Sequence, residues 1–348
     1  MARLPMTSRR SQTADARRRR VLSLLATGEF QSGEQLAKQL RITRSAVWKL
    51  IGNLRKKGIG IEALERQGYR LPRAVQLYDS KIIDAAVSSA SRSAIERIDV
   101  LLTVDSTNRY LIDEEGPLPG QALVCVAEVQ TAGRGRRGRS WIAPFGSGVC
   151  LSLAWQFAES PSGFSALSLV VGVAVTRALR RLHCDQVQLK WPNDIVHRHR
   201  KLAGILIDMR GEAGGPARVV IGIGLNLHMP PETRIALAEQ QAALITDLQD
   251  VTNGHPPERN ELVAVMVDEL IVALRVFERD GFGAFETEWR GIDSLLDAPV
   301  RVLSANETIV GIARGVAGDG ALLVDIDGKL QRFMSGDVSL RAVAREPS

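Results

Sequence analysis

The chain is poor in the residues that cross-link small secreted proteins or hold metal ions. Its 348 residues include only three cysteines and five histidines. Cys125, Cys150 and Cys184 are scattered through apolar segments, so we expect buried thiols rather than a disulfide framework. His197 and His199 lie in a polar turn without a carboxylate or cysteine at ligand spacing, so we predict no metal ion held by protein side chains.

Long apolar runs and the common nucleotide-binding signatures are also missing. No uninterrupted apolar run reaches the roughly 18 residues of a membrane span, and the basic N-terminus lacks the apolar core of a signal peptide. We therefore expect a cytoplasmic protein without a membrane partner. No GKS or GKT is present, which excludes a Walker P-loop. The segment GRGR at 133–136 is followed by another strand pattern instead of a helix, which excludes a dinucleotide-binding fingerprint.

Length and charge divide the chain into unequal parts. A chain of 348 residues is too long for one ordinary core, which predicts two or three domains. Residues 1–73 hold 17 Lys and Arg against 5 Asp and Glu, a net charge of +12, whereas the whole chain carries only +6. The remainder therefore carries −6. This asymmetry indicates a polyanion-binding N-terminal module attached to an ordinary globular body.

The N-terminal module has the pattern of a DNA-binding domain. Residues 1–20 are basic and lack apolar periodicity, so we predict a mostly disordered tail there, with an end that can join the next helix. Ser32 and Gln35 form a capping-box pattern before a short helix, and Thr43 can cap a second helix after a three-residue turn. The alternating segment GIGIEALERQGYRL reads as a β-hairpin. Together they predict a winged helix-turn-helix over residues 21–73.

The second of these helices presents a polar and basic outer face. Its candidate DNA contacts are Arg44, Ser45, Lys49, Asn53, Arg55 and Lys56. A three-helix protein-contact domain with solvated charges would give the same pattern, since bare helix-turn-helix patterns are common. The concentrated positive charge favours DNA over that alternative.

The rest of the chain predicts an α+β fold. Strand patterns occur near IDVLLTVDS, ALVCVAEV, GVCLSLAWQF, VQLKW, KLAGILIDM and VVIGIGLNL. Helices are expected near residues 164–182 and 258–279. Mostly consecutive strands with few helices between them favour an α+β layer over a doubly wound sheet. From about Pro299, short strands separated by turns predict a small β-barrel of SH3-like type.

Between two strand patterns lies GRGRRGRSW, residues 133–141, which interleaves four arginines with glycines. Glycines allow backbone N–H groups to approach an anion, arginine forks bind phosphate oxygens, and Trp141 offers a ring for stacking on a base. The pattern favours a phosphorylated small molecule. A solvated basic loop and a nucleic-acid contact remain alternatives from these nine residues alone.

Four further segments carry polar groups at strand ends: DSTN at 105–108, KWPND at 190–194, KLAGIL at 201–206 and GIGLNL at 222–227. Three have an ordinary explanation, namely a helix cap, a turn and a lysine that reaches solvent, and Asn226 in the fourth is a polar group among apolar residues that needs a partner. In this order and with these gaps, however, they and the arginine loop closely resemble the bacterial biotin–protein ligases. The N-terminal GEFQSGEQLA and the C-terminal RGVAGDGALLVDIDG extend the similarity to the bifunctional form, a ligase with a biotin-responsive repressor.

The resemblance implies a reaction, substrates and partners. ATP and biotin, with Mg²⁺, would form biotinyl-5′-adenylate, and the biotinyl group would pass to a lysine of a biotin carboxyl carrier protein of acetyl-CoA carboxylase. The adenylate-bound protein would form a homodimer, bind operator DNA and repress biotin-synthesis genes. It also implies a central mixed-sheet ligase domain of the class II synthetase-like biotin/lipoate ligase type over residues 78–297, and an SH3-like domain over residues 298–348.

The resemblance also assigns site residues through the shared motifs. Catalytic roles fall to Lys201, Arg136 and Asp194. Biotin contacts fall to Ser106, Thr107, Asn108, Gln130, Arg134, Gly135, Arg136 and Lys201, with Asn108 completing the strand end. ATP or adenylate contacts fall to Arg136, Arg137, Arg139, Trp141, Asn193 and Asn226. Ser140 stands where lysine is expected in the best-known member of the family.

Three alternatives remain at this point. The first is a monofunctional ligase whose DNA-binding domain is inactive. The second is a lipoate–protein ligase, which the arginine loop and the C-terminal barrel disfavour. The third is a ligand-binding transcription factor without turnover, although the residues expected for chemistry are present.

Overall fold

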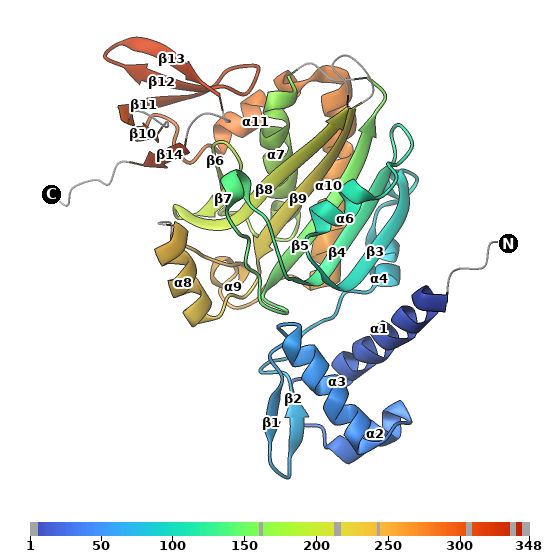
Figure 1. Cartoon of the computed structure of the whole chain (residues 1–348). Coiled ribbons are helices and arrows are strands. Elements are labelled where there is room, and N and C mark those ends of the chain that lie inside the picture. The colour runs from blue at the N-terminus through green and yellow to red at the C-terminus, as the bar shows by residue number, and fades with distance from the viewer. Residues whose placement is uncertain are drawn as a thin grey trace.

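In the computed structural model the chain forms three successive units (Figure 1). The structure describes residues 6–159, 163–211, 217–241, 244–303, 308–334 and 339–342. The first unit is a small helical domain with a hairpin, the second is built on a large mixed sheet, and the third is a small antiparallel sheet.

The N-terminal unit is the winged helix-turn-helix that the sequence predicts. Its elements are α1 (Met6–Leu25), α2 (Gly33–Leu40), α3 (Arg44–Lys56), β1 (Glu62–Leu64) and β2 (Gly68–Arg70). Ser32 caps α2 in a complete capping box with Gln35, and Thr43 caps α3 by accepting a hydrogen bond from the Ala46 N–H. Strands β1 and β2 pair as the antiparallel wing.

One prediction for this unit is wrong. Residues 6–20 belong to helix α1 rather than to a disordered tail, while residues 1–5 lie outside the described part of the chain. The missed signal is a docking contact, because the Arg19 guanidinium donates hydrogen bonds to the carbonyls of Val100 (2.6 Å) and Tyr78 (3.2 Å) in the next unit. Alanine and arginine are also good helix formers, so a basic segment with little apolar periodicity can still continue a helix.

The central unit is built on a seven-stranded mixed sheet within the described residues. The strand order is β3-β4-β5-β9-β8-β7-β6, with β3 parallel to β4 and the other neighbours antiparallel. The strands are β3 (Ile95–Val104), β4 (Ala122–Gln130), β5 (Gly148–Phe157), β6 (Gln188–Lys190), β7 (Asp194–His197), β8 (Arg200–Gly211) and β9 (Ala217–Asn226).

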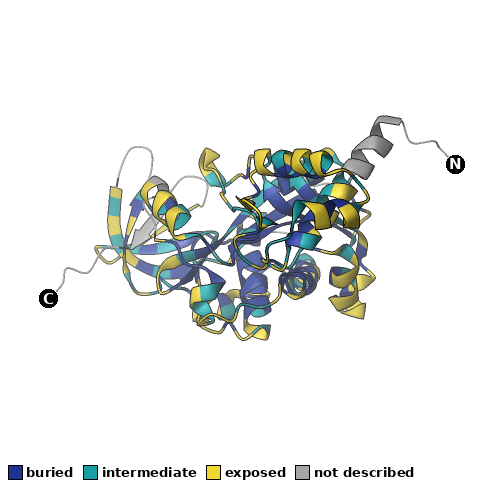
Figure 2. Cartoon of the chain, turned by 90° about the horizontal axis from the view of Figure 1, so that it is seen from below, coloured by how far each residue is buried: buried dark blue, intermediate teal, exposed yellow. Residues whose placement is uncertain are grey.

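Helices cover both faces of this sheet. The long helices α7 (Leu167–Arg181) and α10 (Arg259–Asp280) share the main core with one face, and α6 (Thr107–Asp113) packs on the other (Figure 1). Figure 2 shows the buried residues concentrated between these layers. Double coverage explains why β4 is almost continuously apolar instead of alternating.

Shorter elements complete the unit. They are α4 (Ser80–Ala86), α5 (Ser89–Arg92), α8 (Pro231–Gln241), α9 (Leu248–Val251) and α11 (Glu286–Gly291), with single 3-10 turns η1 (Arg136–Gly138), η2 (Phe164–Ala166) and η3 (Phe282–Ala284).

The C-terminal unit is a five-stranded antiparallel sheet in the order β13-β12-β11-β10-β14, in agreement with the small β-domain predicted here. Its strands are β10 (Pro299–Leu303), β11 (Thr308–Val316), β12 (Leu322–Ile326), β13 (Lys329–Phe333) and β14 (Ser339–Ala342). Its inner face continues the main core. The Trp191 indole N–H donates to the Gly320 carbonyl at 3.1 Å, so a turn of this unit supports the KWPND segment.

A buried ion pair anchors the connection between the first two units. Arg259 donates to Glu128 at 2.8 Å, and their side chains are only 4% and 1% exposed. The same guanidinium lies 3.8 Å from the centre of the Tyr78 ring and donates to the Gln76 carbonyl, while Glu128 accepts the Tyr78 backbone N–H. The pair therefore holds the connecting segment against the sheet.

Substituting Arg259 by Met should destabilise the protein strongly, because Glu128 would keep its burial and lose its countercharge. We expect the free energy of unfolding to fall by about 3–5 kcal/mol. Urea unfolding measures this, with Arg279→Met as the control, because Arg279 is 73% exposed and pairs with Asp280 at the surface. Equal stability of the two variants would contradict a structural role for the buried pair.

Candidate active site

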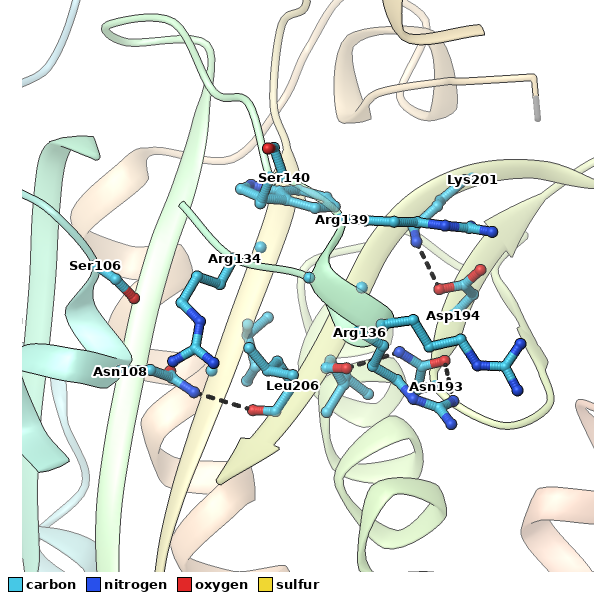
Figure 3. Close-up of a pocket in the computed structure, with 18 of the residues that line it drawn as sticks. Ser106, Asn108, Arg134, Arg136, Arg139, Ser140, Asn193, Asp194, Lys201 and Leu206 are labelled. Carbon is cyan, nitrogen blue, oxygen red and sulfur yellow. Dashed lines mark hydrogen bonds and ion pairs between the residues drawn. The ribbon is translucent and has the colours of Figure 1, made fainter. Parts of the chain in front are cut away.

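One pocket of the central unit collects the residues of the four motifs and the arginine loop (Figure 3). It lies on the face of the sheet that carries α6, between that helix, the arginine loop and the strands β7 and β8. Thirteen of the fourteen residues predicted to contact ligands line it. These are Ser106, Thr107, Asn108, Gln130, Arg134, Gly135, Arg136, Arg137, Arg139, Trp141, Asn193, Asp194 and Lys201.

The uncharged side of the pocket is the N-terminus of α6. Ser106 is the N-cap of this helix and accepts a hydrogen bond from the Arg109 N–H. Asn108 therefore lies in the first helical turn, and the prediction that it ends a strand is wrong, because the strand β3 stops at Val104. A helix start brings consecutive backbone and side-chain polar groups to one place, which a strand end with alternating side chains does not.

Hydroxyl and amide groups are linked beneath this helix. Gln130, at the end of β4, accepts from the Thr107 N–H at 2.7 Å and lies 3.1 Å from the Thr107 hydroxyl. Ser152 of β5 is fully buried and contacts both Thr107 and Asn108. These neutral groups suit a small polar ring rather than a phosphate.

The arginine loop forms a closed turn over the pocket. Gly135 N–H donates to the Arg139 carbonyl at 2.7 Å, Trp141 N–H donates to the Gly133 carbonyl at 2.9 Å, and Arg134 and Ser140 form a bridge between these bonds. A Cβ at Gly133 would lie 2.3 Å from the Trp141 carbonyl oxygen, so this hairpin needs a glycine there.

Glycines of β8 and β9 let Trp141 and Asn108 approach the sheet surface closely. A Cβ on Gly224 would meet the indole at 2.2 Å, and a Cβ on Gly204, its partner across β8 and β9, would lie 3.4 Å away. A Cβ on Gly222 would meet the Asn108 amide at 2.1 Å. These glycines were not among the predicted site residues, although glycines within otherwise branched apolar strands are the signal for such an approach.

Two polar pairs form the charged side. Arg136 donates to the side-chain amide oxygen of Asn193 at 3.0 Å, and the Asn193 amide nitrogen donates to the Ile205 backbone carbonyl at 2.7 Å. Lys201 contacts Asp194 at 2.7 Å with its side chain 20% exposed (Figure 3). The proline bend of KWPND therefore turns Asn193 and Asp194 toward the arginine loop and the lysine.

The charged side is rich in cations. Its lining holds the side chains of Arg134, Arg136, Arg137, Arg139, Lys190 and Lys201 against the single carboxylate of Asp194. Burial and then the neighbouring Arg137 lower the pKa of Arg136, while Asp194 raises it. Arginine keeps its charge in proteins, so this direction means that burial beside another cation makes the Arg136 charge costly. The arrangement favours an anionic ligand with several charges.

Asn226 is the predicted ligand contact that does not line the pocket. It is 3% exposed, and its amide donates to the Thr246 carbonyl at 3.0 Å. It holds the segment around Thr246 beside β8, where the Lys201 N–H donates to the Leu244 carbonyl. The sequence motif does not show that the Asn226 amide bonds to a backbone carbonyl.

The cysteines and possible metal ligands add no chemistry. All three thiols are unpaired and buried, as expected, and burial raises the pKa of Cys150, beside Gln130, to about 12. In the described ranges no three His, Cys, Asp or Glu side chains gather to hold a metal ion. Among the helices of those same ranges, none has the length and apolar character needed to cross a membrane.

On the N-terminal unit, the predicted DNA contacts of α3 are exposed. Arg55 differs from the others because its guanidinium donates two hydrogen bonds to the Ile61 carbonyl, at 2.9 and 2.7 Å, and so supports the wing. Trp48 was not predicted as a contact, yet it is 68% exposed near the middle of the same face. An exposed tryptophan at that position is available for a partner.

Three family models match the chain in the order of its units. They are the HTH domain at residues 17–70, the biotin/lipoate A/B protein ligase family at residues 100–226, and the biotin protein ligase C terminal domain at residues 295–341. The bifunctional ligase/repressor BirA of Salmonella typhimurium is 41% identical over 323 residues, which cover 92% of this chain and 97% of that protein. The chain belongs to the family of bifunctional biotin ligase/repressors.

Further relatives agree with the assignment to the bifunctional ligase/repressor family. The Escherichia coli BirA is 39% identical over 94% of this chain and 98% of its own length. A solved structure of the biotin protein ligase from Aquifex aeolicus, in complex with biotin and ATP, matches 71% of this chain and all of that one, with 26% identity and a TM-score of 0.59. The family and the fold class inferred from the motifs are therefore confirmed.

Substituting Gly224 by Ala should displace Trp141 from the sheet, because the added Cβ would lie 2.2 Å from the indole. We expect a loss of about 1–3 kcal/mol in the free energy of unfolding, typical of overpacking, and faster trypsin cleavage in the arginine loop. Gly52→Ala is the matched control, since nothing lies within 4 Å of its Cβ. A loop cleaved at the wild-type rate in Gly224→Ala would refute the proposed support by Trp141.

Proposed function

We propose that this chain activates biotin with ATP to biotinyl-5′-adenylate and transfers biotin to a lysine of a biotin carboxyl carrier protein. The observation that carries the proposal is a single pocket with two sides, a neutral hydroxyl and amide cradle and a cluster of cations. Biotin is a neutral ureido ring on a chain that ends in a carboxylate, and ATP is a polyanion. The two sides match the two substrates in chemistry.

The neutral cradle accounts for recognition of the biotin ring. Ser106, Thr107 and Gln130 offer hydroxyl and amide groups where the ureido ring needs donors and acceptors, and each is supported by its own neighbours in the fold. Groups held in this way discriminate against ligands that leave them unpaired. This supports biotin over lipoate, whose dithiolane ring has no such donors or acceptors.

The charged side accounts for the first chemical step. In that step a biotin carboxylate oxygen attacks the α-phosphorus of ATP and pyrophosphate leaves, so two anions must be held together. Lys201 is suited to bridge the carboxylate and the α-phosphate, with Asp194 fixing its ammonium at 2.7 Å. Arg136, held by Asn193, is suited to retain the phosphate of the adenylate. Preorganised charges of this kind stabilise the transition state without reorganisation.

The second step requires a neutral carrier lysine to attack the acyl carbon, with AMP as the leaving group. Arg134, Gly135, Arg137 and Arg139 belong to the turn that covers the pocket, and we assign this turn the role of a lid that keeps water from the adenylate. Asp194 and Asn193 line the same pocket beside Lys201 and Arg136, and we assign them the role of orienting an entering lysine.

Magnesium is expected to accompany ATP rather than to reside in the protein. Asp194 is the only carboxylate of the pocket lining, and it already pairs with Lys201. That donor set fits a Mg²⁺ ion carried mainly by phosphates and water, which is the common arrangement with nucleotides. When bound, the ion would offset charge on the departing pyrophosphate.

We assign the N-terminal unit, residues 21–73, to operator binding. The exposed face of α3 with Arg44, Ser45, Lys49, Asn53 and Lys56 has the composition of a recognition helix, and the unit carries the excess positive charge of the chain. Family membership supports repression of biotin-synthesis genes by an adenylate-bound homodimer, since a two-fold dimer matches a two-fold operator. The catalytic and C-terminal domains are assigned to residues 78–297 and 298–348.

The ligase activity is tested by incubating the protein with ATP, Mg²⁺, biotin and an apo carrier domain, followed by intact-mass measurement of the carrier. We expect one biotin-sized mass gain, and a rate about 10²–10³-fold lower for Lys201→Ala because a preorganised charge is lost. Lys329→Ala, an exposed residue of β13, should match the wild type. Adenylate without carrier labelling would favour a regulator without transfer, and preferred labelling with lipoate would favour the other ligase class.

DNA binding is tested by measuring affinity for a biotin-synthesis promoter fragment at several salt concentrations. Lys49→Ala should weaken binding at all sequences and reduce the slope of log affinity against log salt by about 1, because one phosphate contact is removed. Lys81→Ala, an exposed lysine of α4, is the control. If no salt-dependent binding appears with the adenylate present, the chain is a ligase whose helix-turn-helix is inactive.

A further inference from the structure

The Asn108 side chain spans three strands beneath the neutral cradle. Its amide lies over Gly222 of β9, where a Cβ would meet the amide oxygen at 2.1 Å. Ser152 of β5 and Leu206 of β8 are the cross-strand neighbours of Gly222, and Asp208 is two residues further along β8. The amide therefore reaches from β5 to β8 across a gap that only a glycine leaves open.

The partners of this amide fix which way it points. Its nitrogen is 3.3 Å from the Leu206 carbonyl oxygen, as Figure 3 shows. It is also 2.9 Å from an Asp208 carboxylate oxygen, and both of these oxygens can only accept. Its oxygen lies 2.6 Å from the Ser152 hydroxyl. The reverse orientation would place the amide oxygen against two acceptors, one of them charged, so Asp208 makes the observed orientation the stable one.

That orientation decides where the Ser152 proton goes. Ser152 has one hydroxyl proton and two oxygen neighbours, the Asn108 carbonyl oxygen at 2.6 Å and the Thr107 hydroxyl at 2.7 Å. The Asn108 oxygen can only accept, so it takes the proton. The Thr107 proton is then left for Ser152 or for the Gln130 oxygen at 3.1 Å.

The consequence is an open acceptor in the pocket. Because the single Ser152 proton goes to the Asn108 amide oxygen, it cannot also go to the Thr107 hydroxyl at 2.7 Å. In either arrangement none of the described residues then donates to the Thr107 oxygen, and Thr107 lines the pocket. If Asn108 were reversed, its NH₂ would donate to Ser152, and the Ser152 proton would turn to Thr107. One of the two acceptor positions of the Thr107 oxygen would then be occupied, although no side chain in contact with the ligand had changed.

We propose that Asp208 is a positioning residue for biotin specificity, which acts through Asn108 and Ser152 to keep the Thr107 hydroxyl an acceptor for a ring N–H of the ligand. This rests on the proposed function, since biotin supplies the ureido N–H. Neither Asp208 nor Ser152 belongs to the sequence motifs, and Asp208 itself does not line the pocket. We call the hydrogen-bonded series Asp208, Asn108, Ser152 and Thr107 the relay. The donors and the acceptor of the Asn108 amide all bond within the protein, so Asn108 acts in the relay instead of contacting the ligand.

The test is a double-mutant cycle with biotin-dependent exchange of labelled pyrophosphate into ATP as the readout. Asp208→Asn offers Asn108 a donor as well as an acceptor, so the biotin KM should rise about tenfold, the value of one hydrogen bond, with kcat and the ATP KM unchanged. Asp208→Glu keeps an acceptor-only group and should restore most of the loss. Asp113→Asn is the charge-matched control, because Asp113 ends α6 with its side chain 62% exposed.

The second arm of the cycle separates the relay from a general loss of structure. Ser152→Ala removes the group that carries the proton to Thr107, so adding Asp208→Asn to it should leave the biotin KM within about twofold of Ser152→Ala alone. If Ser152→Ala does not fold, Ser152→Cys, a weaker donor, takes its place. An equal rise in KM in both backgrounds, or a parallel fall in kcat and in the unfolding midpoint, would overturn the relay. Wild-type protein without biotin-dependent exchange would instead overturn the proposed function itself.

Discussion

The close approach of side chains to the surface of β8 and β9 is the constraint on which the pocket depends. Gly222 and Gly224 leave bare backbone on this surface, where Asn108 lies against Gly222 and Trp141 lies against Gly224. Trp141 belongs to the arginine loop, so its contact with Gly224 fixes how far the loop lies from the sheet. Asn108 belongs to α6, so its contact with Gly222 fixes the position of that helix. Both walls of the pocket thus take their place from residues that have no side chain.

The second constraint is electrostatic. Six cationic side chains line the pocket with one carboxylate, and part of this cluster is removed from solvent. Such a cluster opposes folding, because like charges repel and burial favours their neutral forms. The main core on the opposite face of the sheet and the buried Arg259–Glu128 pair supply the rigidity that keeps the cations together before ligand arrives.

The sequence predicted the parts of the molecule in which local pattern and chemistry coincide. The caps at Ser32 and Thr43, the wing, the six long strand patterns and the helices α7 and α10 follow from periodicity and capping. Most of the pocket residues followed from motif resemblance. The strand end predicted at Asn108 failed locally, because Ser106 caps a helix there. The other failures share one cause, which is a tertiary partner that the sequence does not show.

Particular residues illustrate this. Helix α1 extends to Met6 in a segment that reads as polar, and Arg19 within it docks on β3. Asn226 bonds to a backbone carbonyl rather than a ligand, and Arg55 bonds to the wing. Asp208 carries no pattern of its own, since a polar residue near a strand end is unremarkable until Asn108 is placed beside it. These roles depend on residues that are far apart in the chain and close in space, and sequence patterns do not show which residues meet.

The docking of the N-terminal unit on the sheet has a geometric consequence. Arg19 binds β3 and Tyr78, Arg73 donates to the Gly146 carbonyl at 2.6 Å, and the hydrophobic core of the N-terminal unit includes Leu102 and Val129 of the sheet. These contacts fix the position of helix α3 relative to the central sheet, so the two units are not joined by a flexible linker alone. In a symmetric dimer the separation of the two α3 helices would then be set by the size and packing of the central units. The spacing between operator half-sites would follow from that separation rather than from the length of a flexible linker.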